Sequence, residues 1–316
     1  MAVYVNTNYS ALQGQRYLGN VQNQLTTTYQ RLSSGMRINS AKDDAAGLQI
    51  SDRLTSQING LNQGNRNASD GIALAQTMEA GMDEISGMLQ KIRTLAVQAS
   101  NGTNTVADKQ ALAKEASSLA TEISRISEQT TYAGKKILFG QQNDETTIFS
   151  KAANAADAGK AGSLTLQVGS NKGDTIKFSV NSFQFSKIGS RADAKFKENY
   201  TDKDVIKIAN KAVTFQFSVA SAAQVTIGLM DQMISDVDAQ RADLGALQNR
   251  LESSIRNQSN VAANEADARS RIRDADFAEE SANLSQQSII QQAAASMLMQ
   301  ANTRPQLGLS LSLIHI

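Results

Sequence analysis

Apolar residues near the start of the chain recur at every third or fourth position. This spacing is that of one face of an α-helix, and its members are Leu18, Val21, Leu25, Thr28 and Leu32. The following Ser33-Ser34-Gly35 is typical of a helix end, because glycine is favoured just after a helix C-terminus. The pattern predicts an amphipathic helix that ends near residue 34 and has a narrow apolar stripe.

A longer series follows Ser40-Ala41-Lys42-Asp43, which resembles a capping box with its carboxylate at the third helical position. Its positions are Ile58, Leu61, Asn65, Ala68, Ile72, Ala75, Met78, Met82, Ile85, Leu89, Ile92 and Leu95. As one helix, residues 43 to 100 would span ~85 Å at ~1.5 Å per residue. Asn101-Gly102 is expected to end it, and a further helix is expected through Leu112, Leu119, Ile123 and Ile126.

The C-terminal part repeats the helical spacing. Steps of three and four alternate without a break, as in a coiled-coil seam, through Val237, Gln240, Leu244, Leu247, Leu251, Ser254, Gln258, Val261, Glu265, Ala268 and Ile272. Several of these positions are polar, which weakens a two-stranded coil but helps to fix its register. A last amphipathic segment places Ile290, Ala294, Met297, Leu298 and Ala301 on one face, and Pro305 is expected to end it.

The middle of the chain differs from both ends in its composition and in its pattern of apolar residues. Eight of the nine Phe lie between residues 139 and 217. Residues 164–168 and 175–180 alternate around a Gly/Asn-containing turn, which indicates a β-hairpin, and residues 213–219 alternate as well. One helix is expected near residues 205–212. Such a segment between two helical arms favours arms that pack on each other and an insert that projects from them.

These patterns predict a mainly α fold. It consists of long antiparallel helical rods, coiled-coil-like, that come from both termini, with a small β-rich central insert. The three Met residues at positions 78, 82 and 88 are interpreted as adaptable core packing.

Composition narrows the function. The 316 residues hold 31 Lys+Arg against 30 Asp+Glu, so the net charge of +1 gives no support for a nucleic-acid partner. Without Cys and with His315 as the single His, thiolate catalysis, His-based acid–base catalysis and thiolate or imidazole metal sites have no residues to build on. No enzyme activity, catalytic residue, cofactor or metal is expected.

The sequence does not show the apolar segments that direct a chain into or across a membrane. No run reaches the ~18 apolar residues of a transmembrane helix, so no membrane insertion is expected. The first residues lack the basic and apolar regions of a secretory signal peptide. By default this would place the chain in the cytosol, although proteins exported unfolded by a dedicated machine carry no such signal.

Five stretches resemble the bacterial flagellin family. The residues 31–47, 60–72 and 95–98 match its N-terminal motifs, and residues 241–250 and 268–277 match its C-terminal motifs. The resemblance covers roughly residues 1–140 and 218–310, with the motifs long and in order.

The resemblance implies a structural subunit that polymerises into the flagellar filament for motility. Residues 1–42 and 275–310 would form a terminal helical layer around the filament lumen, residues 43–140 and 218–274 a helical rod layer, and residues 141–217 the variable insert. It implies type III export, an extracellular location in the filament, and as partners other copies of the chain, an export chaperone and a cap protein. The alternatives are a hook–filament junction protein or another secreted helical surface protein.

Two sets of residues are candidates for contacts. The subunit-packing seam consists of Leu18, Val21, Leu25, Leu32, Ile290, Ala294, Met297 and Leu298. By resemblance, Lys91, Leu95, Gln98 and Glu115 correspond to positions read by the animal Toll-like receptor for flagellin. The family has Arg where this chain has Lys91, which keeps the charge but loses the planar bidentate fork.

Two further features have simple interpretations. Asp43-Asp44 and Asp274 with Asp276 are interpreted as helix caps rather than a cation site, because no EF-hand spacing is present. Residues 311–316 match the in-frame translation of a common transposase sequencing adapter, and we hypothesise that this tail, with His315, is not native. Sequencing the genomic locus tests this, since the same codons followed by native flanking sequence would contradict it.

Overall fold

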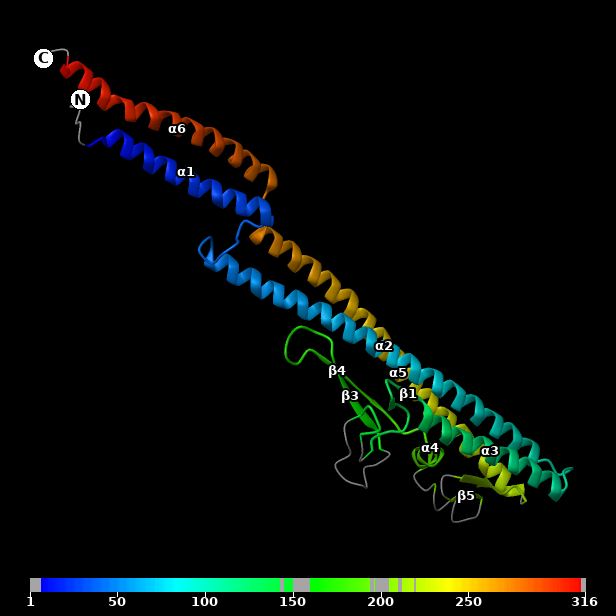
Figure 1. Cartoon of the computed structure of the whole chain (residues 1–316). Coiled ribbons are helices and arrows are strands. Elements are labelled where there is room, and N and C mark those ends of the chain that lie inside the picture. Colours follow the sequence, from blue (N-terminus) through cyan, green and yellow to red (C-terminus); the bar gives the residue numbers. More distant parts are fainter. Residues whose placement is uncertain are drawn as a thin grey trace. The chain divides into compact units, whose positions relative to one another are not determined.

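The computed structural model describes residues 7–142, 145–149, 160–193, 196, 205–209, 212–218 and 220–313 (Figure 1). These residues form six helices: α1 (Tyr9–Ser34), α2 (Ala45–Ala99), α3 (Val106–Gln129), α4 (Phe185–Ala192), α5 (Ala220–Arg273) and α6 (Phe277–Leu313). The chain divides into a first unit of Met1–Ile58 with Val261–Ile316 and a second unit of Asn59–Asn260. Within the described residues, no helix has the length and apolarity that a membrane span requires.

In the first unit, α1 and α6 run antiparallel, and we call this pair the terminal hairpin. The side chain of Asn8 caps α1 by accepting from Ala11 N at 3.1 Å, and it donates to the carbonyl of Ala301 at 2.7 Å. Gly35 ends α1 at φ +69°, a left-handed conformation that a residue with a Cβ adopts only under strain. The predicted end of the first helix is confirmed.

The C-terminal end of α6 differs from the prediction. The helix continues through Pro305 to Leu313, so the predicted stop at Pro305 is wrong. Proline removes one backbone donor and crowds the carbonyl four residues earlier, which weakens a helix without having to end it. Residues 311–313 of the suspected tail belong to α6, whereas residues 314–316, with His315, lie outside the described residues.

The two segments that join these helices to α2 and α5 pair with each other. Arg37 N donates to Arg273 O at 2.7 Å, and Ala275 N donates to Gly35 O at 3.0 Å. The predicted capping box at Ser40 is wrong: the Asp43 carboxylate accepts from the backbone N of Ser40 at 2.9 Å and closes a turn instead. Helix α2 begins at Ala45 because Asp44 caps it: the Asp44 side chain accepts from Gly47 N at 2.9 Å, and its backbone carbonyl accepts from Leu48 N at 3.0 Å.

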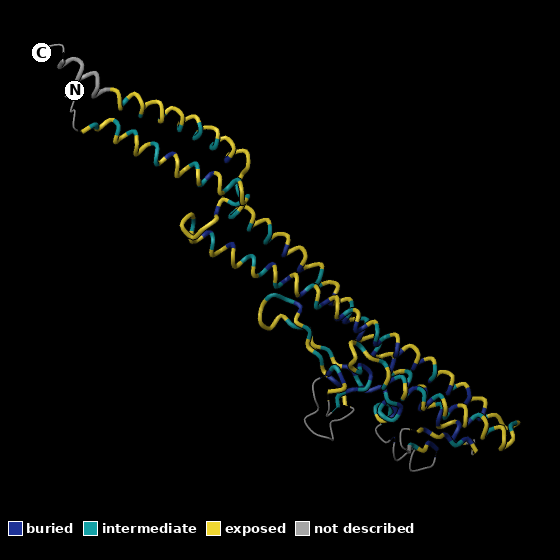
Figure 2. Tube along the Cα trace, in the orientation of Figure 1, coloured by how far each residue is buried: buried dark blue, intermediate teal, exposed yellow. Residues whose placement is uncertain are grey.

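The second unit, which we call the rod body, has a continuous apolar core. Antiparallel α2 and α5 are joined at their surface by Gln248 to Glu79 at 2.9 Å and by Arg241 to Asp83 at 3.0 Å. The predicted α2 positions from Ala75 to Ile92 are fully buried: Ala75, Met78, Met82, Ile85, Leu89 and Ile92. In Figure 2, buried positions recur as dark-blue segments along the long helices. The predicted rods and their seam are confirmed here.

Near its C-terminal end, the seam of α5 departs from the prediction. Val261 is 37% exposed, whereas Ala262, outside the predicted series, is 9% exposed. A series with 3.5 residues per turn drifts around a straight helix that has 3.6, so the buried stripe moves by about one position.

The insert is built from short antiparallel pairs. They are β1 (Thr131–Tyr132) with β2 (Lys135–Lys136), β3 (Gly162–Gln167) with β4 (Thr175–Val180), and β5 (Ile206–Ala209) with β6 (Ala212–Phe215). The β3–β4 hairpin confirms the prediction. The helix expected near residues 205–212 is wrong, because burial there alternates along β5 and β6 with period two, as in a half-buried strand.

The helix of the insert lies elsewhere, in α4, where Phe185, Ile188 and Gly189 are buried at helical spacing. The expectation that the insert projects is also wrong. Phe183, Phe185 and Phe217 are fully buried and belong to the same core as the long helices. An aromatic segment of this kind covers the rod because its large side chains need an apolar surface.

Candidate subunit-packing surface

The predicted seam of the terminal hairpin is only partly buried. Val21 is 7% exposed, whereas Leu18, Leu25, Leu32, Ala294 and Leu298 are half-buried. Ile290 and Met297 are exposed, with Met297 at 69%. The structure therefore brings the seam residues of the two helices together, but two helices do not cover them.

A groove of about 620 Å³ runs between α1 and α6. Its walls consist of small, apolar and uncharged polar side chains: Ser10, Gln13, Gly14, Tyr17, Val21, Ile290, Ala293, Ala294, Met297, Gln300 and Ala301. Four predicted seam residues line it: Val21, Ile290, Ala294 and Met297. A groove of this composition suits another apolar surface better than a charged ligand.

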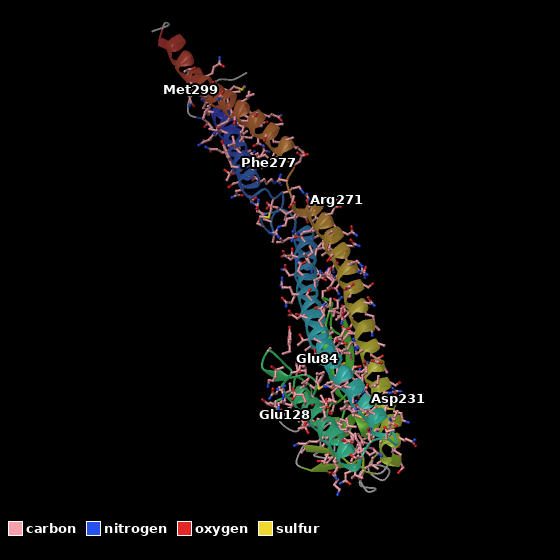
Figure 3. All side chains as sticks on the ribbon, turned by 90° about the vertical axis from the view of Figure 1, so that its right-hand side faces the viewer. Glu84, Glu128, Asp231, Arg271, Phe277 and Met299 are labelled. Atoms are coloured by element: carbon pink, nitrogen blue, oxygen red, sulfur yellow. The ribbon has the colours of Figure 1, made fainter. Side chains whose placement is uncertain are left out.

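Further large apolar side chains lie on other faces of the terminal hairpin. These are Tyr9, Leu12, Tyr29, Phe277, Ile289 and Met299. Figure 3 labels Phe277 near the start of α6 and Met299 further along it, where the latter is 70% exposed. Periodicity alone does not identify these residues, because they lie off the 3-4 stripe. For Ile289 and Met299, the signal is the absence of any charged residue between 281 and 303. Exposed apolar surface on this scale marks an interaction site.

Polar contacts also join α1 and α6 inside the terminal hairpin. Arg31 Nη1 lies 2.9 Å from Glu280 Oε1, and the Glu280 side chain is only 9% exposed. Thr28, which is buried, donates to the side-chain oxygen of Gln287 at 3.2 Å. Glu280 Oε2 and Arg31 Nε have no hydrogen-bond partner in the described part of the chain. These polar contacts fix which residues of α1 and α6 face each other.

Among the four candidate receptor residues, two form an ion pair. Lys91 Nζ on α2 lies 3.1 Å from Glu115 Oε1 on α3, and both side chains are about half exposed. Gln98 is exposed, but Leu95 is only 7% exposed and belongs to the rod core. The structure places three of the four on the surface.

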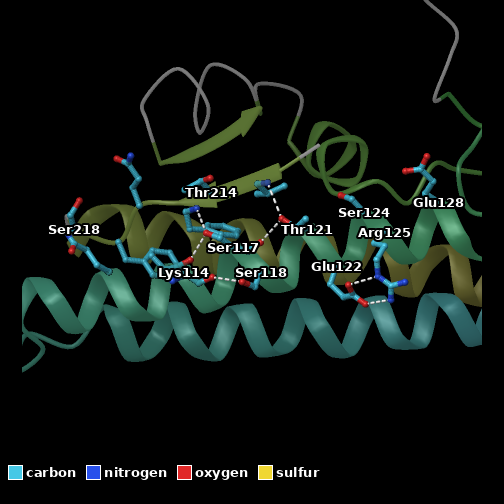
Figure 4. A pocket seen from close by; sticks show the side chains of 16 residues that line it. Lys114, Ser117, Ser118, Thr121, Glu122, Ser124, Arg125, Glu128, Thr214 and Ser218 are labelled. Carbon is cyan, nitrogen blue, oxygen red and sulfur yellow. Dashed lines mark hydrogen bonds and ion pairs between the residues drawn. The ribbon is translucent and has the colours of Figure 1, made fainter. Parts of the chain in front are cut away.

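A groove of the rod body lies between α3 and β6 and measures about 990 Å³ (Figure 4). Ser117 and Thr121 accept from the backbone N of Phe215 at 2.9 Å and of Val213 at 3.4 Å. These hydroxyls take the place of a neighbouring strand for β6. Nearby, the Arg125 side chain donates to Glu122 and lowers the pKa of that carboxyl.

Asp274 and Asp276 accept hydrogen bonds from residues close to them in the sequence. Asp276 accepts from Ala278 N at 2.9 Å at the start of α6, and Asp274 accepts from the Ser270 hydroxyl at 2.6 Å. Within the described ranges, no group of three or more His, Cys, Asp or Glu side chains is arranged to hold a metal ion.

Taken together, these features define a class of protein: a helical structural subunit with a self-contained rod body and a thin, incompletely covered terminal hairpin. Comparison with known proteins specifies the family. The bacterial flagellin N-terminal helical region matches residues 5–143, and the bacterial flagellin C-terminal helical region matches residues 227–311.

Sequence relatives extend over nearly the whole chain. Polar flagellin C of Vibrio parahaemolyticus is 35% identical over 383 aligned residues, which cover 98% of this chain and 100% of the relative. Flagellin A of Vibrio cholerae is 36% identical over 379 residues, with the same coverage. The chain belongs to the bacterial flagellin family and is a structural subunit of the flagellar filament.

A solved structure shares the fold. A protein described as flagellar hook-associated, from Vibrio parahaemolyticus, superposes with a TM-score of 0.53 over 73% of this chain and 100% of its own, at 15% identity. At that identity the likeness concerns the fold alone. Both terminal regions and the full-length sequence relatives support flagellin over the alternative of a hook–filament junction protein.

Proposed function

We propose that this flagellin polymerises outside the cell through its terminal hairpin and thereby builds the filament that drives motility. Export through the type III channel would deliver the chain unfolded. The observation that carries the proposal is the uncovered apolar surface of α1 and α6, above all Met297 and Met299 at 69% and 70% exposure. A helix pair with so much apolar surface in water gains stability from neighbouring copies that cover it.

The proposal assigns a layer to each part. Residues 1–42 and 275–310 form the layer around the lumen, residues 43–140 and 218–274 the rod layer, and residues 141–217 the outer insert. The helix pairing of α1 with α6 supports the first assignment, and the uncharged stretch at 281–303 suits a wall that other chains pass. The rod layer needs a stable core, which Met78, Met82 and Ile85 provide.

The mechanism is mechanical rather than catalytic. Lateral packing of rod bodies and coaxial packing of terminal hairpins would make a stiff tube. In support of a structural role, the polar side chains of the groove between α3 and β6 hold the fold: the hydroxyls of Ser117 and Thr121 accept from backbone N–H groups of β6, and the nearby Glu122 is paired with Arg125.

Seeded polymerisation tests the proposal. Removal of residues 1–42 or 275–310 should abolish filaments in electron microscopy, while circular dichroism still shows helical rods. A finer test is Met297→Asp, which puts a charge into the groove between α1 and α6. The matched control is Thr165→Asp, at an exposed position on β3 in the insert. Filaments from Met297→Asp as long as those of the control would contradict the proposal.

The export chaperone and the cap protein are proposed as partners by resemblance. Both would meet the terminal segments before these are covered by neighbouring subunits. Pull-down of the full chain against the same chain lacking residues 275–310 tests the chaperone; equal retention would contradict this assignment of its binding segment.

A second candidate function is recognition by the host Toll-like receptor. The observation in favour is the exposed Lys91–Glu115 pair, which lies on the surface of the rod body with Gln98. We expect Lys91→Ala and Gln98→Ala to lower receptor activation by monomers, and Lys91→Arg to raise it because Arg restores the planar fork. Thr165→Asp serves as the control. Unchanged activation in all variants would exclude this surface.

A further inference from the structure

The turn that joins α2 to α3 contains Asn101-Gly102, and the chain contains a second Asn-Gly pair, Asn59-Gly60, inside α2. An Asn side chain can react with the backbone nitrogen of the next residue, because the two can close a five-membered ring. Glycine offers the least steric resistance to this ring, since it has no Cβ. The same reaction is chemically available to both Asn-Gly pairs, but one pair lies in a turn and the other inside a helix.

Asn101 and Gly102 lie in an open part of the molecule. Both are exposed, and a Cβ built on Gly102 would have no other atom within 4 Å. In the described part of the chain, no hydrogen bond is donated by Gly102 N. The Asn101 side-chain oxygen accepts from Thr103 N at 3.4 Å, which turns the carboxamide back over the backbone on the side of Gly102.

Asn59 and Gly60, in contrast, lie inside a helix and are covered by a neighbouring segment. Inside α2 the backbone N–H of Gly60 is engaged with the carbonyl four residues earlier, and the helical ψ of Asn59 keeps its side chain away from that nitrogen. A Cβ on Gly60 would lie 2.7 Å from Ser170 Cβ, so the turn of the β3–β4 hairpin covers this site as well. The ring can form at Asn59 only after α2 opens locally.

We propose that Asn101 is a site of spontaneous deamidation, with water as the co-reactant. Gly102 N loses its proton and bonds to Asn101 Cγ; the Cγ–Nδ2 bond breaks, and ammonia leaves. Water then adds to either carbonyl of the cyclic imide, so the ring opens to aspartate or to isoaspartate. Each product carries one new carboxylate, and the isoaspartate also lengthens the main chain by one atom.

The product changes the end of α2. Asn101 N and the Asn104 side chain both donate to Gln98 O, at 3.1 and 2.6 Å, so this turn closes the last carbonyls of the helix. A negative charge there faces the negative end of the helix dipole. Deamidation therefore loosens the turn beside Gln98 as the protein ages, independently of polymerisation.

Incubation of the full-length protein in neutral buffer, followed by peptide mass spectrometry with isoaspartate detection, tests the proposal. We expect conversion at Asn101 to be at least about tenfold faster than at Asn59 in the native protein, because the latter must first leave the helix. In strong urea the two rates should become similar. Gly102→Ala should slow the reaction at residue 101 and leave residue 59 unchanged.

Two outcomes would overturn the proposal. One is equal conversion of Asn59 and Asn101 in the native protein, which would remove the role of structure. The other is an Asn101 that stays intact in the native protein but converts in urea, which would mean that the turn protects it. Circular dichroism of Gly102→Ala checks that the rod body remains helical.

Discussion

The rod body and the terminal hairpin use the same spacing of apolar residues but reach different degrees of burial. In the rod body, α2 carries six consecutive seam positions that are fully buried, because α3, α5 and the insert all cover it. In the terminal hairpin, among the residues of α1 and α6 up to 303, where burial is described, the buried ones are Val21, Thr28 and Glu280, two of which are polar. A helical stripe therefore becomes a core only when more than one neighbour packs against it.

This difference has an energetic meaning. Full burial of a large apolar side chain stabilises a fold by ~1.5–3 kcal/mol, and the rod body has many such residues. A pair of isolated helices has little of this stabilisation to offset its conformational entropy. The rod body is thus expected to fold alone, and the terminal hairpin to depend on neighbouring copies.

The largest effect is expected from a core truncation. Ile92→Ala removes a fully buried side chain of the rod body and should cost ~2–5 kcal/mol of unfolding free energy. Ile290→Ala on the terminal hairpin should change the stability of the monomer by less than ~0.5 kcal/mol, but slow polymerisation. Urea unfolding followed by circular dichroism measures both. Equal losses would refute the contrast between the two regions.

The next effect concerns how the β3–β4 hairpin packs on α2. A Cβ at Gly64 would lie 2.1 Å from the carbonyl oxygen of Val168, so the hairpin must move away in Gly64→Ala. We expect a loss of ~1–3 kcal/mol in the same urea experiment. The matched control is Gly87→Ala on the same helix, where nothing lies within 4 Å; this change should stabilise by ~0.5–1 kcal/mol. A Gly64→Ala protein as stable as the control would mean that the hairpin is not closely packed there.

The polar interior of the terminal hairpin gives a third test. Glu280→Leu leaves Arg31 partly buried without its carboxylate, and we expect filaments to lose ~1–3 kcal/mol per subunit. The double variant Arg31→Leu with Glu280→Leu should recover most of this loss, since apolar replacement of a whole buried pair is often neutral or stabilising. Thermal melting of purified filaments measures the cycle. Additive losses from the two changes would show that the pair is not coupled.

Much of this architecture could be predicted from the sequence. The positions from Ala75 to Ile92 and the β3–β4 hairpin could be predicted because their spacing alone fixes which residues share one face of the helix or strand. The strand at 206–209 could not be predicted in this way, since it forms by pairing with β6 and Ile206 is buried in a core that residues distant in the sequence complete. The exposure of Met299 and the burial of Leu95 likewise depend on which helices cover them.

The smallest effect is expected from the cap of α3. Thr105 and Asp108 form a capping box, and the pKa of Asp108 is lowered, first by the hydrogen bond from the Thr105 side chain and then by that from its backbone. The pKa of Asp43 in the first unit is lowered in the same way, by backbone N–H groups of Ser40 and Asn39. A carboxyl with a lowered folded pKa stabilises fully above its ordinary value of 3.8 and loses this effect as the pH falls through the folded value.

In acid, each region should therefore lose the hydrogen bonds that one carboxylate accepts, those of Asp108 in the rod body and those of Asp43 in the first unit. The effects on stability should differ between the two regions. In the rod body, Thr105→Ala should cost ~1 kcal/mol at neutral pH and make unfolding less sensitive to acid. Asp43→Asn should leave urea unfolding of the rod body unchanged and affect only polymerisation, because Asp43 closes a turn of the first unit. Unfolding curves recorded across the acidic range compare the two variants. A rod body that responds to Asp43→Asn as strongly as to Thr105→Ala would show that the two regions fold as one, and the contrast drawn from their burial would fail.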